Sequence, residues 1–391
     1  MGSRRTALVT LAAVLLALAV GIWLGGHPQH LPDVIGDALV GEDRALRAEI
    51  IDTVADNFYK SVEEDDLERA SLKGIIESLG DPFSYYLTPS EARRLRESVS
   101  GEFEGVGMNV EEDRRGLRVL KVFERSPARR AGIHKGELIV AVNGRSIAGV
   151  SSEVATSRIK GPSGTRVQLE VIGADGESRR TVTVERERIE VPVVEGRVVE
   201  RQGRRLGLVE LLNFSSGAHG ALRREVEELL EKGVTGIVLD LRGNGGGLLD
   251  EAVLVSSIFI EDGEIVSVRG RARPERRESA EGDAIAEGLP MVVLVDGGSA
   301  SASEIVAGAL RDRDQATVVG TRTFGKGLVQ ELEDLSNGGL LDLTVARYYL
   351  PSGRTIGPAG LAPQVKARDD PSTDRDEALP VALDELLDAY P

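Results

Sequence analysis

The feature that most limits the fold is an alternation of predicted strands and helices beginning near residue 191. Short apolar runs typical of buried strands are separated by stretches with the apolar period of an amphipathic helix. The runs are RLGLVEL, GIVLDL, MVVLVDG and ATVVG, and the helical stretches lie at 221–233, at about 248–259 and at 303–312. Because parallel strands need crossover connections, this alternation predicts a mainly parallel sheet covered by helices.

The remaining sequence predicts a multidomain protein of mixed α/β and α+β class. Short alternating strands and glycine turns precede the α/β core, with one longer helix at Ser151–Lys160, and they predict a small β-rich barrel or sandwich. The polar stretch 270–288 predicts a solvated loop. The expected segments are 1–26, an apolar anchor or signal peptide; 27–41, a linker; 42–99, a helical region; 100–189, the β-rich domain; 190–368, the core; and 369–391, a charged tail with a short helix.

The N-terminus predicts a location beyond the cytoplasm. Arg4 and Arg5 precede an uncharged apolar run, Thr6–Gly26, that at about 1.5 Å per residue is long enough for a bilayer core of roughly 30 Å. Basic residues before such a run place its start in the cytoplasm. A cleaved signal peptide is the alternative, but no clear A-x-A site follows. The domains are therefore expected in the periplasm or cell envelope, anchored to the membrane by this segment.

Composition excludes several classes of function. The chain has 48 basic and 64 acidic residues, a net charge of −16, which disfavours nucleic acid as a partner. It has no cysteine, so disulfides and thiolate catalysis are excluded, and its four histidines show no metal-ligand spacing. We therefore expect no metal and no cofactor.

Three segments of the core contain residues suited to catalysis, each at or just past the end of a predicted strand, where open parallel sheets bind their ligands. DLRGNGGG, Asp240–Gly247, offers unobstructed backbone N–H groups, and DGGSASASEIV, Asp296–Val306, places serines at the start of a helix. TRTFGKG, residues 321–327, contains a lysine between glycines. Taken singly, each has an ordinary structural explanation: a tight turn, a helix cap at Ser299, and a surface lysine.

Lys326 also fits the G-x-x-x-x-G-K spacing of a phosphate-binding loop, with Gly320 and Gly325. Such a loop ends in Ser or Thr and leads into a helix, whereas here Gly327 and a strand-like pattern follow. A nucleotide site is therefore disfavoured. A desolvated lysine can instead serve as a general base for a serine, and neither His134 nor His219 lies near the serine segment in the sequence.

These motifs together resemble one protease family. DLRGNGGGLLDEAV, GSASASEIVAGAL and GTRTFGKGLVQ, in this order, are similar to the signature of carboxyl-terminal processing proteases, which are serine–lysine endopeptidases with an inserted PDZ domain. GEFEGVGMNV, SPARRAGIHKGELIVAVNG, SLGDPFSYYL and LTVARYYLPSGRTI also match, so the resemblance covers about Leu46 to Pro363. It implies a PDZ-like domain at 100–189 inserted before a crotonase-like or ClpP-like protease core.

The resemblance also implies roles for individual residues. Ser301 falls at the position of the nucleophile and Lys326 at that of the general base, with the family's spacing of 326 − 301 = 25. Gln330 would orient the lysine. The N–H groups of Ala302 and of Gly246, or of a neighbouring glycine, would form the oxyanion hole.

The implied function is an extracytoplasmic serine endopeptidase that works through an acyl-enzyme and selects proteins by a free C-terminal segment. The peptide would add as a strand beside GVGMNV, with its carboxylate at the turn formed by Gly105, Val106, Gly107 and Met108. The N-terminal helices resemble a dimerisation arm, although their apolar face could equally pack internally.

Two alternatives remain. The first is a membrane-tethered PDZ adaptor with an inactive or latched protease fold. The second is a penicillin-interacting acyl hydrolase. That class requires S-x-x-K, and Ser301 is followed at that spacing by Glu304, which disfavours it.

Overall fold

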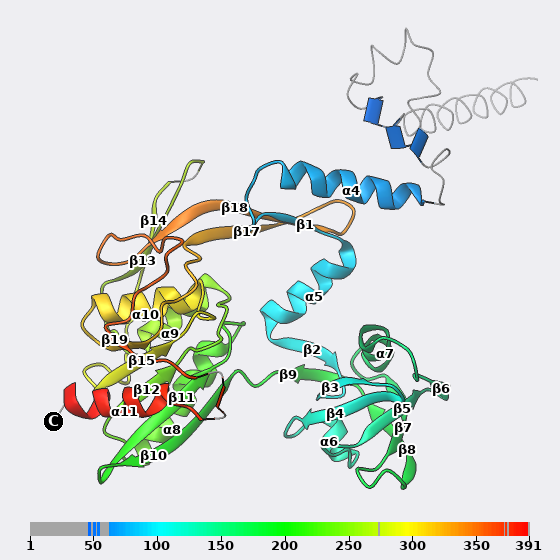
Figure 1. Ribbon diagram of the computed structural model, residues 1–391, viewed down its shortest axis with the longest axis horizontal. Helices are drawn as coiled ribbons and strands as arrows, with labels where there is room; N and C mark the ends of the chain where they lie inside the picture. The colour runs from blue at the N-terminus through cyan, green and yellow to red at the C-terminus, as the bar shows by residue number, and fades with distance from the viewer. Residues whose placement is uncertain are drawn as a thin grey trace, which may run out of the picture. The chain divides into compact units, whose positions relative to one another are not determined.

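The computed structural model describes residues 46–47, 50–51, 53–54, 62–272, 274–370, 372–373 and 375–389 (Figure 1). The predicted segments 1–26 and 27–41 lie outside these residues. In the part of the chain that is described, no helix combines the length and apolar character needed to cross a membrane. The chain forms two compact units, one with residues up to Thr88 plus Leu340–Asp342, the other with Pro89–Gly339 plus Leu343–Pro391.

The smaller unit contains helix α4 (Glu64–Glu77) and strand β1 (Tyr85–Leu87). The first turn of α4 carries three acidic residues, a favourable arrangement at the positive end of a helix dipole. Strand β1 pairs antiparallel with Leu340–Asp342, which places Tyr85 opposite Asp342. Burial and a hydrogen bond with Asp342 raise the pKa of Tyr85 to about 12, so its hydroxyl stays protonated at neutral pH.

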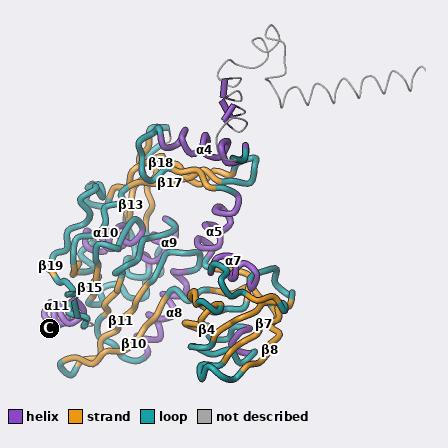
Figure 2. The backbone as a smooth tube through the Cα atoms, turned by 45° about the vertical axis from the view of Figure 1, so that its right-hand side comes forward, coloured by secondary structure: helices purple, strands orange, loops and turns teal. Residues whose placement is uncertain are grey.

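The larger unit begins with helix α5 (Pro89–Ser100), followed by the predicted β-rich domain (Figure 2). Its sheet has the order β3-β4-β5-β7-β8, with β6 paired to β5, so β3 is an edge strand. The chain enters and leaves this domain through an antiparallel ribbon of β2 and β9. The elements are β2 (Glu102–Gly105), β3 (Met108–Asp113), β4 (Gly116–Val122), α6 (Pro127–Arg130), β5 (Leu138–Val142), β6 (Arg145–Ser146), α7 (Ser152–Ile159), β7 (Arg166–Ile172), β8 (Arg179–Glu185) and β9 (Glu187–Glu190).

The predicted α/β core is present. Its sheet has the order β10-β11-β12-β15-β16-β19, and every neighbouring pair is parallel except β10 with β11. The elements of this layer are β10 (Val194–Arg201), β11 (Arg204–Leu211), α8 (Ala218–Glu231), β12 (Ile237–Asp240), α9 (Leu249–Ser257), β15 (Met291–Val295), α10 (Ala302–Asp312), β16 (Thr317–Gly320), β19 (Val365–Lys366) and α11 (Ala378–Ala389).

Helices cover both faces of this sheet, and alternate strand residues show which helix each face meets. In β12, Ile237 and Leu239 pack in the cluster that contains α8, α9 and α10. Val238, which points the other way, packs with α11. Both faces are therefore buried, which explains why these strands are uniformly apolar rather than alternating.

A second sheet contains β13 (Glu264–Gly270), β14 (Arg276–Ser279), β17 (Leu328–Asp334) and β18 (Leu340–Tyr349). Strand β14 corrects the prediction of a solvated loop at 270–288. It pairs antiparallel with β13 but is largely exposed, so its sequence, Arg276 to Ser279, lacks the apolar residues that normally reveal a strand.

Candidate active site

Three loops follow the carboxyl ends of adjacent parallel strands β12, β15 and β16, and they contain the segments singled out from the sequence. Hydrogen bonds connect them directly. The N–H of Ala300 donates to the carbonyl of Asn244 (3.0 Å), and the N–H of Phe324 donates to the carbonyl of Ser299 (3.0 Å). The fold therefore gathers the glycine run, the serine segment and the lysine loop at one edge of the sheet.

The serine segment separates two structural serines from Ser301. Ser299 and Ser303 are fully buried, and their hydroxyls donate to the carbonyls of Leu241 and Asn244, both at 2.8 Å. Ser301 is only half-buried and stands immediately before α10. Its backbone has φ 55° and ψ −114°, a conformation that non-glycine residues rarely adopt. Such local strain is often found at functional sites, where the surrounding structure holds it in place.

Backbone donors lie close to Ser301. Ala302 is the first residue of α10, where an N–H has no intrahelical acceptor. Gly246 packs against the same point, since a Cβ at Gly246 would lie 2.9 Å from Ser301 Cβ and 3.0 Å from Ala302 N. The Gly246 N–H donates to Asn244 Oδ1 (2.9 Å), which leaves the neighbouring exposed Gly245 as a second source of an N–H in this run.

Lys326 lies in a loop that requires glycine on both sides. A Cβ at Gly327 would lie 1.6 Å from the carbonyl oxygen of Ile356, and one at Gly325 would lie 2.6 Å from that of Gly357. No side chain fits at position 327, so the Ser or Thr of a phosphate-binding loop is sterically excluded. Strand β17 follows the lysine, as expected from its sequence pattern. Lys326 itself is half-buried.

Glu304 connects the serine and the lysine, and the sequence reasoning missed this role. Its fully buried carboxylate accepts the N–H groups of Ser301 (3.0 Å) and Lys326 (2.9 Å), both through Oε2. Its Oε1 accepts the Gly325 N–H (2.8 Å) and the Thr323 hydroxyl. Four donors compensate the buried charge. The available signal was the S-x-x-E spacing of a capping box, Ser301 to Glu304.

Gln330 lies on β17, four residues after Lys326, and its Nε2 donates to Thr344 Oγ1 on β18 at 3.3 Å. The start of β17 lies between Lys326 and Gln330, so an extended segment joins the two residues.

A cluster of charges supports the other end of the glycine run. The guanidinium of Arg242 binds Asp240, Asp369 and Asp376. Burial lowers its pKa, but hydrogen bonds to Asp240 and Asp376 raise it further, so it lies above the usual value of arginine. The cluster joins the loop after β12 to the segment that precedes α11.

The residues expected to bind a peptide lie where a groove meets β3. Val106, Gly107 and Met108 line a cavity of about 310 Å³ together with residues of α7. In the described chain, no acceptor is found for the N–H groups of Val106 and Gly107, although both residues are buried. Buried N–H groups without acceptors are rare, which suits a site that takes oxygen atoms from a ligand. Gly105 ends β2 just before this turn.

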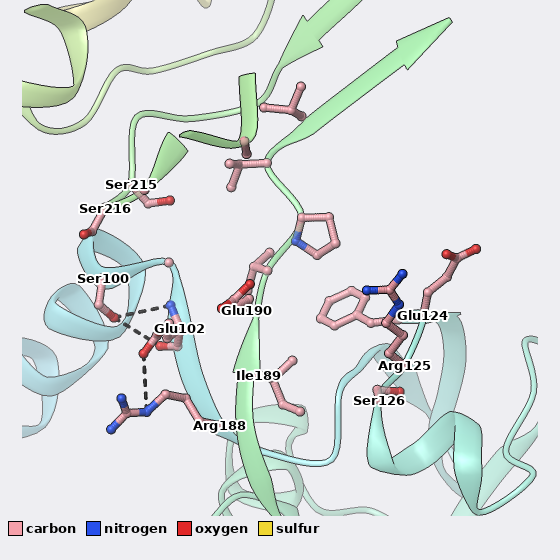
Figure 3. Close-up of a pocket in the computed structure, with 18 of the residues that line it drawn as sticks. Ser100, Glu102, Glu124, Arg125, Ser126, Arg188, Ile189, Glu190, Ser215 and Ser216 are labelled. Carbon is pink, nitrogen blue, oxygen red and sulfur yellow. Dashed lines mark hydrogen bonds and ion pairs between the residues drawn. The ribbon is translucent and has the colours of Figure 1, made fainter. Parts of the chain in front are cut away.

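A separate cavity of about 860 Å³ lies where the β-rich domain joins the core (Figure 3). Charges of both signs line it, including Glu102, Arg125 and Glu190, and Glu102 pairs with Arg188. It contains none of the catalytic candidates, so it is not part of the candidate active site.

Comparison with known families agrees with both domains. The model of peptidase family S41 matches residues 205–367, and the model of the PDZ domain matches residues 95–172. A model described as the copper transport outer membrane protein MctB matches residues 1–73.

Curated relatives extend the match to most of the chain. The carboxy-terminal-processing protease of Bartonella bacilliformis is 36% identical over 323 residues, which cover 81% of this chain and 73% of the relative. CtpA of Bacillus subtilis, a carboxy-terminal processing protease, is 35% identical over 80% of this chain and 66% of its own length. A probable CtpA-like serine protease of Staphylococcus saprophyticus is 34% identical over 81% of this chain and 64% of its own length. The chain thus spans just under two thirds of the last two relatives.

Solved structures show the same fold. The photosystem II D1 C-terminal processing protease is 30% identical, with a TM-score of 0.50 over 84% of this chain and 94% of that chain. A putative S41 protease from Bacteroides fragilis has a TM-score of 0.52 over 88% and 97% at 18% identity, which shows the fold alone. The sequence and structural matches together place this chain in the family of carboxy-terminal processing proteases, peptidase family S41, with a PDZ domain.

Proposed function

We propose that the chain is a serine endopeptidase in which Ser301 is the nucleophile and Lys326 the general base. The observation that carries this proposal is the carboxylate of Glu304, whose Oε2 accepts the backbone N–H groups of both residues. This shared acceptor holds the two backbones at one point of the sheet edge. A turn with a purely structural role would not need a buried carboxylate, whereas a site that must hold these two residues together has a use for the Glu304 side chain.

In the proposed mechanism, neutral Lys326 takes the proton of Ser301 as Oγ attacks a peptide carbonyl. The resulting oxyanion would accept hydrogen bonds from the N–H of Ala302 and from a glycine N–H, either Gly246 or the exposed Gly245. One such donor is worth about 2.7–4 kcal/mol in a serine protease. The lysine then protonates the leaving amine, and a water that it activates releases the acyl-enzyme. Gln330 would support the lysine from β17.

Substrates would be selected by their C-terminal segment. An extended peptide can pair with the edge strand β3, which lines one cavity with α7, and its carboxylate would accept the N–H groups of Val106 and Gly107. The lining residues Val106, Met108 and Ile159 favour apolar side chains. We further propose an extracytoplasmic location with an N-terminal membrane anchor, and a homodimer formed through the N-terminal helices; α4 buries none of its residues within this chain.

Turnover of an unfolded protein with a free apolar C-terminus tests the proposal. Parent, Ser301→Ala and Lys326→Ala chains are compared with Ser336→Ala and Lys135→Ala, which change the same residue types away from the loops. We expect cleavage by the parent and both controls, and none by the two site variants, all with parental thermal unfolding. Loss in Ser301→Ala alone would move the base elsewhere, and binding without cleavage by the parent would favour the PDZ adaptor.

A further inference from the structure

The PDZ groove ends at a lysine that the proposed function leaves without a role. Lys160 directly follows α7 and lines the groove with Val106 and Gly107. A Cβ placed on Gly105 would lie 3.8 Å from the Lys160 Cγ, and the N–H of Gly161 donates to the carbonyl of Glu104 (3.4 Å). The lysine stem therefore runs beside the turn whose buried N–H groups lack acceptors.

The position of this lysine is fixed from two sides. Its Nζ lies 5.0 Å from the centroid of the Phe103 ring, within the range of a cation–π contact. The end of α7 is held by Arg186, a buried guanidinium that donates to the carbonyls of Arg158 and Ile159. Its other partners are the Thr165 hydroxyl and the Arg166 carbonyl, also uncharged oxygens. Lys160 thus brings a positive charge to the groove, and Arg186 holds the backbone just before it.

One carboxylate already binds this lysine. Lys160 forms an ion pair with Glu97, which lies in the last turn of α5. The pair is partly exposed, with side-chain exposures of 36% and 42%. An ion pair of this kind contributes little stability and can be exchanged for another.

We propose that Lys160 is the residue that recognises the terminal carboxylate of the substrate, and that Glu97 holds the lysine in the empty groove. When a peptide enters, its carboxylate accepts the N–H groups of Val106 and Gly107 and replaces Glu97 as the partner of Lys160. The ligand is an extended peptide with a free α-carboxylate and apolar final residues. This inference rests on the proposed selection of substrates through the PDZ groove.

Peptide binding measured by fluorescence anisotropy tests the exchange. The full chain carries Ser301→Ala so that the peptide is not cleaved. The probe is a fluorescein-labelled peptide with apolar final residues, used as the free acid, as the C-terminal amide, and as an amide ending in Asp. Lys160→Met and Glu97→Gln are compared with Lys135→Met, which removes an exposed ammonium elsewhere in the domain.

We expect the parent to prefer the free acid to the amide. Lys160→Met should weaken binding of the acid about fivefold and leave the amide unchanged, since an exposed charge pair has roughly this effect. Glu97→Gln should strengthen binding of the acid about twofold, because the competing carboxylate is gone. It should have no such effect in a Lys160→Met background. Lys135→Met should match the parent.

Other outcomes distinguish recognition by Lys160 from the selection of C-termini by the groove. If the parent prefers the acid and Lys160→Met keeps the same ratio, recognition by Lys160 is refuted while selection of C-termini stands. Weaker binding by Glu97→Gln would refute the exchange. Equal binding of the Asp-ending amide and the free acid would refute recognition of the α-carboxylate. Equal binding of acid and plain amide by the parent would overturn C-terminal selection itself, and this inference with it.

Discussion

At the scale of the residue, Glu304 is the centre of the proposed active site. Its carboxylate is fully buried; Oε2 accepts from both the serine segment and the lysine loop, and Oε1 accepts twice from the lysine loop. A charge in this setting is maintained only while its donors stay in place, because an uncompensated buried carboxylate is strongly unfavourable. The hydrogen bonds to Glu304 therefore hold the backbones of Ser301 and Lys326 together. The buried carboxylate in turn is tolerated only while these bonds are formed.

We expect Glu304→Gln to lower kcat by about 10- to 100-fold, the equivalent of roughly 1.5–3 kcal/mol for a hydrogen bond to a charged group. The amide keeps the shape but turns an NH₂ toward N–H donors. Glu231→Gln, an exposed change at the end of α8, should match the parent in turnover and thermal unfolding. Parental kcat in Glu304→Gln would show that the shared acceptor does not position the dyad.

The sequence could predict some of these residues and not others. Ser301 and Lys326 could be proposed because small residues and glycines follow predicted strands and because the motifs resemble a family, and their roles remain predictions. Glu304 could not be distinguished from an ordinary capping glutamate, since its second set of donors comes from the loop after the next strand, β16. The strand β14 was missed for a related reason: an exposed edge strand has no apolar period.

At the scale of the element, the lysine loop depends on the absence of side chains. Gly327 packs on the carbonyl of Ile356, and a Cβ there would lie 1.6 Å from that oxygen. We expect Gly327→Ala to displace the loop, abolish turnover and lower the melting temperature. Gly357→Ala is the matched control, because a Cβ there meets nothing within 4 Å. Turnover by Gly327→Ala at the parental rate would mean that the loop can shift without moving Lys326.

The segment before α11 is a second element with a defined anchor. Asp376 binds Arg242 through both oxygens and also accepts the N–H of Leu379. Burial raises the pKa of Asp376, but the hydrogen bond from Arg242 lowers it more, so its pKa lies below the usual value. A carboxyl with a depressed pKa stabilises the folded chain above its unfolded pKa, and this contribution is lost as the pH falls through the folded value.

Asp376→Asn keeps the acceptor for Leu379 and removes the charge. We expect it to lower the free energy of unfolding by about 1 kcal/mol near neutral pH, a value reduced for solvent screening. The difference from the parent should begin to shrink below about pH 4 and vanish only once the pH falls through the lowered pKa of folded Asp376, where the parent side chain is also neutral. Urea unfolding across this range measures it, with the exposed Asp388→Asn as control. A difference that is constant with pH would exclude the ion pair as its cause.

At the scale of the whole molecule, the PDZ domain is an insertion connected to the rest of its unit through the paired strands β2 and β9. The chain enters and leaves the domain at one place, so the insertion of the domain does not interrupt the sheet of the core. The core has its own six-stranded sheet, and both faces of that sheet are buried. The proposed capture of a C-terminus and the proposed chemistry at Ser301 would therefore take place in separate domains.

This separation predicts how a substrate's C-terminus should affect the kinetics. An unfolded protein with a free apolar C-terminus is compared with the same protein whose C-terminal carboxylate is amidated. If the groove only captures substrate, amidation removes binding that is equal in the ground and transition states, so KM rises while kcat is unchanged. We expect this result, measured as initial rates over a range of substrate concentrations. A short labelled peptide that reaches only the core should be cleaved equally with either terminus. A fall in kcat on amidation would instead mean that an occupied groove also changes the geometry around Ser301.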